Sequence, residues 1–144
     1  MKLLKKVYTQ KLSFKIILIC LPLVCCNTNE IKDVKMIEGM WEIYSVKAKG
    51  ETFYPKGNPP LIDYYIFNSD SSGTKKKMKQ NFNNIFLSSL DEINFEIIEI
   101  EGFIYLDFIS KYSNWREKVE KLTKNELIIS NKIFEYHYRR FKKN

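Results

Sequence analysis

Apolar and polar residues alternate with a period of two through most of the chain beyond residue 38. In the stretch 39–47, for example, Trp41, Ile43 and Ser45 share one parity, opposite Glu42. Such alternation is typical of a strand that buries one of its faces. The pattern predicts eight strands within about 100 residues, at 39–47, 63–68, 74–82, 92–100, 103–110, 115–122, 126–130 and 133–141.

Two of the predicted strands carry an irregular pattern. In 92–100 the apolar parity changes between Ile97 and Ile98, which predicts a β-bulge at that point. In 115–122 charged residues fall on both parities, so the alternation identifies this strand less clearly than the others.

Short turns separate the predicted strands. Paired prolines mark a loop at 57–60, and 69–73 is a cluster of turn-forming residues. Strands joined by short turns pair with their neighbours in the sequence, and eight of them close into a barrel without free edges. The predicted fold class is therefore all-β, an eight-stranded up-and-down antiparallel barrel. A β-sandwich with Greek-key connections is the alternative, which the short turns disfavour.

A short helical segment is predicted before the first strand. Ile31, Val34 and Ile37 recur at a spacing of three, which is typical of a one-sided helix or a 3₁₀ turn. Asn27, followed by Glu30 three residues later, is suited to cap such a segment.

The N-terminus has the pattern of a secretory signal. Residues 1–15 contain five lysines and no acidic residue, and 16–26 is apolar throughout. A basic head followed by a short apolar core is typical of a signal peptide. The apolar run is too short to cross a bilayer, which takes about 20 residues.

The end of this run resembles the lipobox of bacterial lipoproteins. Leu23, Val24 and Cys25 precede Cys26, which the resemblance identifies as the lipidated residue. Cleavage one position earlier would make Cys25 the lipidated residue instead. We therefore expect a signal peptide at 1–25, a polar tether and short helix at 26–36, and the barrel domain at 37–142. The lipid on Cys26 would make the membrane a partner of the protein.

The net charge of the whole chain, +7, comes mostly from the signal. Without residues 1–25 there remain 19 basic and 17 acidic residues, so a nucleic-acid partner is not expected. All three cysteines, Cys20, Cys25 and Cys26, lie in the signal or at its end. The barrel domain therefore has no cysteine for an internal disulfide, and its stability must come from its core.

The start of the first strand resembles the lipocalin family. Gly39-Met40-Trp41 matches the G-x-W signature of that family, in which the Trp closes the floor of the barrel and packs against an arginine of the last strand. Arg140 stands where that arginine is expected, with Arg139 as the other candidate. The segments 73–77, 115–117 and 136–141 are also similar to small lipocalin-like lipoproteins of the Bacteroidota. The resemblance implies a structural floor formed by Gly39, Trp41 and Arg140.

No catalytic or metal-binding pattern stands out. His137 is the only histidine, and neither a second imidazole nor a nucleophile motif accompanies it, so we expect a half-buried or surface role, no enzymatic activity, no metal and no cofactor. Glu92 and Glu96 alternate with apolar residues and are expected on a solvated face. The same expectation applies to Lys75 and Lys77 in the basic run 75–79.

The aromatic residues are the richest source of candidate binding groups. Most are expected in the core, and some would line an apolar cup open at one end, with tyrosine hydroxyls orienting a polar group of the ligand. The candidate ligand-binding residues are Tyr64, Phe67, Tyr105, Tyr136 and Tyr138.

Two functions remain open at this stage. The first is a lipid-anchored lipoprotein of the bacterial envelope, most readily of the outer membrane, that binds a small apolar or amphipathic ligand. The alternative is a protein-interaction module with a filled barrel, whose long loops 49–60 and 83–92 contact an envelope protein.

Overall fold

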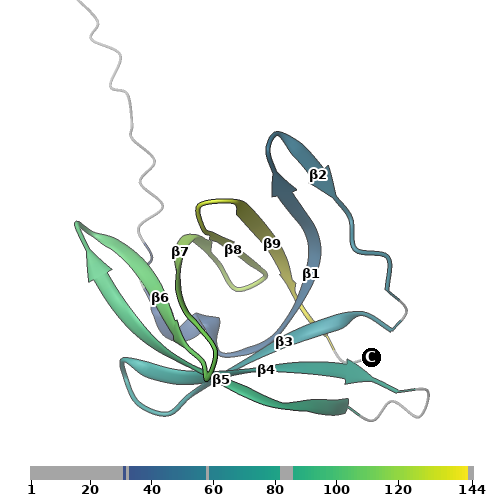
Figure 1. The fold of residues 1–144 in the computed structure, drawn as a ribbon, viewed down its shortest axis with the longest axis horizontal. Helices are drawn as coiled ribbons and strands as arrows, with labels where there is room; N and C mark the ends of the chain where they lie inside the picture. Colours follow the sequence, from purple (N-terminus) through teal and green to yellow (C-terminus); the bar gives the residue numbers. More distant parts are fainter. Residues whose placement is uncertain (1–30, 32, 58, 82–85, 143–144) are drawn as a thin grey trace, which may run out of the picture.

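The computed structural model describes residue 31 and the ranges 33–57, 59–81 and 86–142 (Figure 1). The predicted signal peptide, Cys26, Cys25 and the proposed cap at Asn27 and Glu30 lie outside the described residues.

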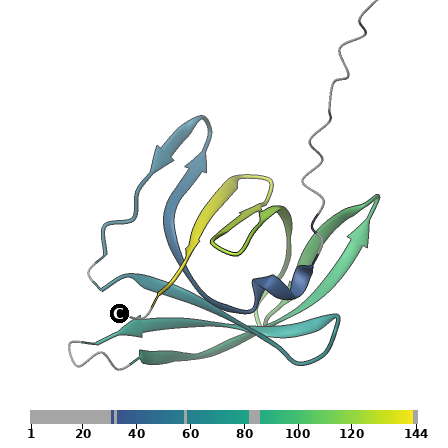
Figure 2. The same cartoon turned by 180° about the vertical axis from the view of Figure 1, so that it is seen from behind.

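Nine antiparallel strands form one sheet. They are β1 (Gly39–Ala48), β2 (Glu51–Phe53), β3 (Leu61–Phe67), β4 (Ser72–Gln80), β5 (Phe86–Ile100), β6 (Phe103–Ile109), β7 (Asn114–Leu122), β8 (Glu126–Ser130) and β9 (Phe134–Arg140). From β3 to β9 each strand pairs with the next in sequence, β1 pairs with β3, and β1 also pairs with β9. This last pairing closes eight of the strands into a barrel, which Figures 1 and 2 show from two opposite sides. The predicted up-and-down antiparallel barrel is confirmed, and the Greek-key sandwich is excluded.

The additional strand, β2, was not predicted. It pairs only with the far end of β1, from Val46 opposite Phe53 to Ala48 opposite Glu51. Lys49 and Gly50 form the turn between them, both with positive φ, as a tight hairpin turn requires. All three side chains of β2 are exposed, so no alternation of apolar and polar residues marked it.

The prediction of a bulge at Ile97 and Ile98 is wrong. The pairing of β5 with β6 runs without interruption from Asn94 opposite Ile109 to Ile100 opposite Phe103. The pairing of β5 with β4 ends at Glu96. The tip of the β5–β6 hairpin, at 99–100 and 103–104, extends beyond the neighbouring strands, because β6 pairs with β7 as far as Tyr105 opposite Lys118 (Figure 1). The inner parity of Ile93 and Phe95 continues to Ile97, which packs against the core, and Ile98 and Ile100 are half-buried on the other parity.

Register shifts occur instead in β1, in β7 and between β4 and β5, where Lys76 pairs with Glu92 but Met78 pairs with Ser88. In β1 the register shifts between Ile43 and Ser45, so that Val46, not Ser45, pairs with Tyr136 of the inner face. The prediction that Ser45 continues the face of Trp41 is therefore wrong. In β7 the register shifts between Val119 and Lys121. After this shift Leu122 is buried, which explains the irregular pattern of 115–122.

A single 3₁₀ turn, η1 (Val34–Ile37), precedes the barrel and packs at one end of it. Asp33 caps η1 by accepting a 2.9 Å hydrogen bond from the backbone N–H of Lys35. Ile37 is fully buried and belongs to the barrel core. No helix within the described ranges has the length and apolar character needed to cross a membrane. The remaining core residues lie on the inner parities of the strands: Trp41, Tyr65, Phe95, Leu106, Phe108, Val119, Leu122, Leu127, Ile129 and Tyr138.

Candidate functional site

The end of the barrel next to η1 is closed by Trp41 and Arg140. The central carbon of the Arg140 guanidinium lies 3.9 Å from the centre of the Trp41 ring, a cation–π contact. The indole Nε1 of Trp41 donates a 2.6 Å hydrogen bond to the carbonyl of Ile37. Arg140 donates to the carbonyls of Met36 and Glu38 at 2.5 Å each and to that of Lys124 at 3.2 Å. This arginine thus ties η1 and the β7–β8 turn to the floor.

Gly39 leaves the space that Arg140 occupies. Its φ is +113°, and a Cβ at this position would lie only 2.7 Å from Nη1 of Arg140. The other candidate arginine, Arg139, points outward and forms two hydrogen bonds with Glu42, at 2.8 and 2.9 Å. The geometry therefore places Arg140, and not Arg139, against Trp41.

The opposite end of the barrel holds a cavity of about 740 Å³. The turn between β8 and β9 lies at its mouth, where Ile133 and Lys132 are exposed. The cavity lies within the range of about 300–1,000 Å³ found for small-molecule sites. Its apolar lining comes from Ile43, Ile93, Trp115, Phe134, Tyr136 and Tyr138, and its charged lining includes Asp63, Lys75, Lys77 and Glu117.

Two of the five predicted ligand-binding residues, Tyr136 and Tyr138, line this cavity. Phe67 lies against the core instead, with its ring centre 5.8 Å from that of Phe95. Tyr64 and Tyr105 occupy the outer parity of their strands, because the buried Tyr65 and Leu106 next to them face inward. The prediction from composition treated aromatic residues alike, whereas strand parity separates them.

Lys75 lies inside the barrel, where a solvated face was predicted. The residue is 6% exposed, and its ammonium lies 4.1 Å from the centre of the Phe108 ring and 5.8 Å from that of Trp115. Burial lowers the pKa of Lys75, although the nearby carboxylates of Asp63 and Glu117 oppose this shift. Within the described ranges, no carboxylate forms an ion pair with Lys75. Its parity is inward because it pairs with Tyr65 on β3 and Ile93 on β5.

Lys77 shares the inner parity of β4 but has a partner. It forms an ion pair with Asp63, a residue only 1% exposed. Asp63 also accepts a 2.9 Å hydrogen bond from the hydroxyl of Tyr138. Burial raises the pKa of Tyr138 well above its usual value, so this hydroxyl keeps its proton and acts as a donor. The charge of Asp63 is thus compensated within the barrel.

Glu117 is the second buried acid of the cavity, and sequence analysis did not single it out. Its Oε1 accepts a 3.1 Å hydrogen bond from the indole of Trp115. Its Oε2 is buried, and no residue in the described part of the chain donates to it. Burial raises the pKa of Glu117, with Lys75 as the main opposing influence. The alternation of the strand could have identified Glu117 as an inward-facing residue, since it shares the parity of Trp115 and Val119.

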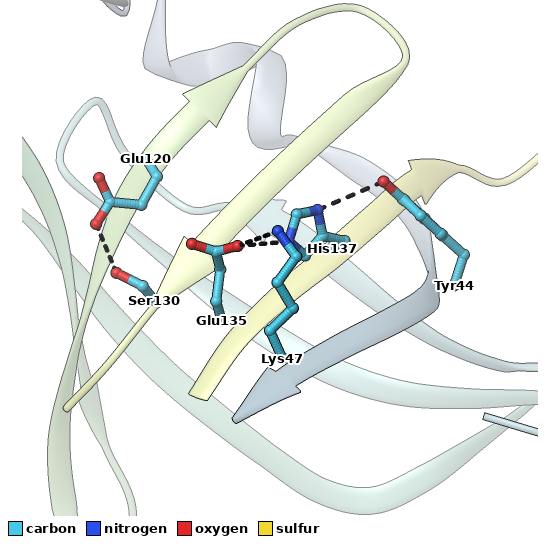
Figure 3. A network of polar contacts seen from close by, with 6 residues as sticks. All are labelled: Tyr44, Lys47, Glu120, Ser130, Glu135 and His137. Atoms are coloured by element: carbon cyan, nitrogen blue, oxygen red, sulfur yellow. Dashed lines mark hydrogen bonds and ion pairs between the residues drawn. The ribbon is translucent and has the colours of Figure 1, made fainter. Parts of the chain in front are cut away.

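His137 is 8% exposed, so the prediction of a half-buried or surface position is wrong. It belongs to a separate polar network on the outer parity of β9, shown in Figure 3. Its Nε2 lies 2.6 Å from Glu135, its Nδ1 lies 3.4 Å from the Tyr44 hydroxyl, and Lys47 contacts Glu135 at 3.0 Å. Nearby, Ser130 donates a 2.6 Å hydrogen bond to Glu120. The network joins side chains of neighbouring strands across the closure of the barrel, and it lies away from the cavity lining.

The predicted solvated acids of β5 lie on the surface. Glu92 is exposed and pairs with Lys76 on the outer face of β4, and Glu96 is exposed. Over the described ranges, no three His, Cys, Asp or Glu side chains come together as metal ligands would.

No protein-family model matches the sequence, and no curated protein is significantly similar to it. Solved structures with a similar chain path include a lipocalin-like protein from Bacteroides uniformis ATCC 8492, which is 12% identical with a TM-score of 0.47; the match covers 74% of this chain and 99% of that one. An uncharacterized protein from Bacteroides eggerthii DSM 20697 is 12% identical with a TM-score of 0.46, over 72% and 98%. A variant of the fluorescent protein UnaG is 12% identical with a TM-score of 0.43, over 76% and 99%.

Proposed function

We propose that this protein is a binding protein for a small amphipathic molecule, which it holds in the open end of the barrel. The observation that carries this proposal is the cavity of about 740 Å³ inside the strands. The alternative of an interaction module requires a filled barrel, and the space between Trp115 and Tyr136 argues against it.

The lining supports an amphipathic ligand over a purely apolar one. Ile43, Ile93, Trp115 and Tyr136 offer apolar surface for the body of a ligand. Lys75 and Glu117 lie among these residues and would interact with a polar group. We propose no catalytic role, because the one histidine of the sequence lies in the outer network, away from the cavity lining.

The proposal is tested by the fluorescence of N-phenyl-1-naphthylamine, a neutral apolar probe that brightens when it leaves water. Ile43→Trp places a larger side chain in the cavity and is expected to abolish the increase. Tyr105→Trp adds similar bulk on the outer face and is expected to keep it. No increase with the unaltered protein, or an equal increase with Ile43→Trp, would exclude the cavity as a binding site.

We also propose that the barrel is anchored in the bacterial envelope, most readily in the outer membrane, through a lipid on Cys26. The sequence pattern at 1–26 supports this location. Cys26→Ala is expected to abolish labelling by radioactive palmitate and to release the protein into the soluble fraction, whereas Cys20→Ala, within the signal, is expected to leave both unchanged. Labelling that persists in Cys26→Ala but is lost in Cys25→Ala would move the anchor by one position. Persistence in both variants would contradict a lipoprotein.

A further inference from the structure

The barrel interior contains two lysines in different situations. Lys77 is half-exposed and forms its ion pair with Asp63. Lys75 is almost fully buried and borders the cavity, yet within the described ranges no carboxylate pairs with its ammonium. Its contacts are the faces of aromatic rings, chiefly that of Phe108 at 4.1 Å. A buried charge without an ionic partner is costly to the fold.

We propose that Lys75 is the recognition point for the anionic head group of the ligand, and that this group is a carboxylate. The inference rests on the proposed function and specifies the ligand class of the same cavity. In the complex the carboxylate would accept hydrogen bonds from the Lys75 ammonium and give this lysine the ionic partner that the described residues do not provide. The apolar body of the ligand would extend past Trp115 toward the mouth.

The charges around Lys75 favour a group with a single negative charge. Asp63 is compensated by Lys77 and Tyr138, so it does not compete for Lys75 at close range. Glu117 lies in the same cavity and would repel an anion when it is ionised, but burial favours its neutral form. A phosphate monoester with a second charge would meet the same two carboxyl groups, and Lys132, another lysine of the cavity lining, lies exposed at the mouth and not beside Lys75.

The aromatic surroundings of Lys75 also suit this role. The rings of Phe108 and Trp115 hold the lysine in place and exclude water from it. A hydrogen bond between an ammonium and a carboxylate is stronger in such an environment than in water. On the outer face of the same strand, Lys76 pairs with Glu92, and its side chain is 26% exposed. Lys76 therefore serves as the matched control for Lys75.

The test compares three probes of equal chain length, dodecanoate, dodecanol and dodecyl phosphate, by isothermal titration below their aggregation concentrations. The unaltered protein is expected to bind dodecanoate about tenfold or more tightly than dodecanol, the effect of one charge-assisted contact in a dry site. Dodecyl phosphate is expected to bind less tightly than dodecanoate. Lys75→Met is expected to remove the preference for the acid while keeping the affinity for the alcohol, which also shows that the variant folds. Lys76→Met is expected to keep the preference.

The outcomes separate this inference from the proposed function. Equal affinity for the acid and the alcohol, or a preference that survives in Lys75→Met, overturns the assignment of Lys75 while the cavity remains a binding site. A preference lost in Lys77→Met but kept in Lys75→Met also overturns it. A higher affinity for dodecyl phosphate than for dodecanoate overturns the carboxylate. If neither dodecanoate nor dodecanol binds, both the inference and the proposed function fail.

Discussion

The hydroxyl of Tyr138 donates a 2.9 Å hydrogen bond to the carboxylate of Asp63 inside the barrel, although 75 residues separate the two in the sequence. Both residues are almost fully buried. This bond joins β9 to β3 across β1, the strand that lies between them in the sheet. It therefore links the two sides of the seam at which the barrel closes.

Removing this bond is expected to weaken the fold. Tyr138→Phe keeps the ring but leaves a buried carboxylate with one donor fewer, which should lower the free energy of unfolding by about 1.5–3 kcal/mol. Tyr105→Phe removes a hydroxyl from the outer face and should change the free energy by less than about 0.5 kcal/mol. Urea denaturation monitored by circular dichroism measures both values. Equal effects of the two substitutions would show that the bond to Asp63 contributes nothing.

The two neighbouring arginines of β9 are expected to differ sharply. Arg140→Ala removes the cation–π contact with Trp41 and three hydrogen bonds to carbonyls, and should cost about 2–4 kcal/mol. Arg139→Ala removes an exposed pair with Glu42, which is worth less than about 1 kcal/mol. Thermal unfolding of the two variants checks the difference. The reverse order would contradict the structural role of Arg140.

Glu117 is expected to make stability fall as the pH rises. Burial raises the pKa of Glu117 in the folded state above the pKa of about 4.3 that a glutamate has in the unfolded state. Between these two pKa values the native state therefore binds more protons than the unfolded state. The free energy of unfolding therefore decreases with pH across this window. Glu117→Gln keeps the acceptor for Trp115 and should make stability in this window less dependent on pH. Urea titrations from pH 4 upward, about 0.5 pH units apart, test this. An unchanged pH profile in Glu117→Gln would refute the prediction.

Lys75 is expected to reduce the stability of the empty barrel. Its pKa is lowered by burial, which means that the folded state disfavours the charged form at neutral pH. The contribution of Lys75 to stability is therefore least favourable below its pKa in the folded state. It improves as the pH rises from there toward the pKa in the unfolded state, about 10.4.

Lys75→Met should raise the free energy of unfolding at neutral pH by about 1 kcal/mol or more, which is the gain found when apolar side chains replace buried charges. Lys76→Met should not do so. A gain in stability together with a loss of ligand binding is the behaviour expected of a binding residue. A marked loss of stability in Lys75→Met would mean that the contact with Phe108 serves the fold.

Sequence alternation predicted the barrel because each strand of an up-and-down barrel must bury one face. It placed all eight strands of the closed barrel, and it missed β2, whose exposed residues carry no such pattern. It also began the fifth strand too late: β5 starts at Phe86, so residues 86–92 of the predicted loop 83–92 belong to a strand. The bulges could not be located, because they depend on the register between strands. The bulge in β1 moved Val46, in place of Ser45, to the inner face, and only the pairing with Tyr136 shows this.

The charged cavity was harder to predict than the fold. A lysine on an alternating strand is usually solvated, so both Lys75 and Lys77 were expected on a solvated face. Lys77 is 46% exposed, whereas Lys75 is buried. The inner parity of β4 is set by its pairing with Tyr65 on β3, which is a relationship between distant segments. Glu117 could have been found, because its parity matches two apolar residues of its own strand. Among the aromatic candidates, the prediction was correct for Tyr136 and Tyr138 of β9. The alternation of this strand is unbroken, so both residues face the cavity.

Native mass spectrometry measures directly whether a ligand occupies the cavity. The sample is the Cys26→Ala protein recovered from cells without detergent, which avoids both the lipid anchor and apolar additives. We predict a discrete added mass that is lost on unfolding and corresponds to a carboxylic acid. This added mass is expected to be strongly reduced when Lys75→Met is introduced. A protein that shows only its own mass and binds no added fatty acid would contradict the proposed function, because a cavity that accepts no amphipathic molecule is not a binding site.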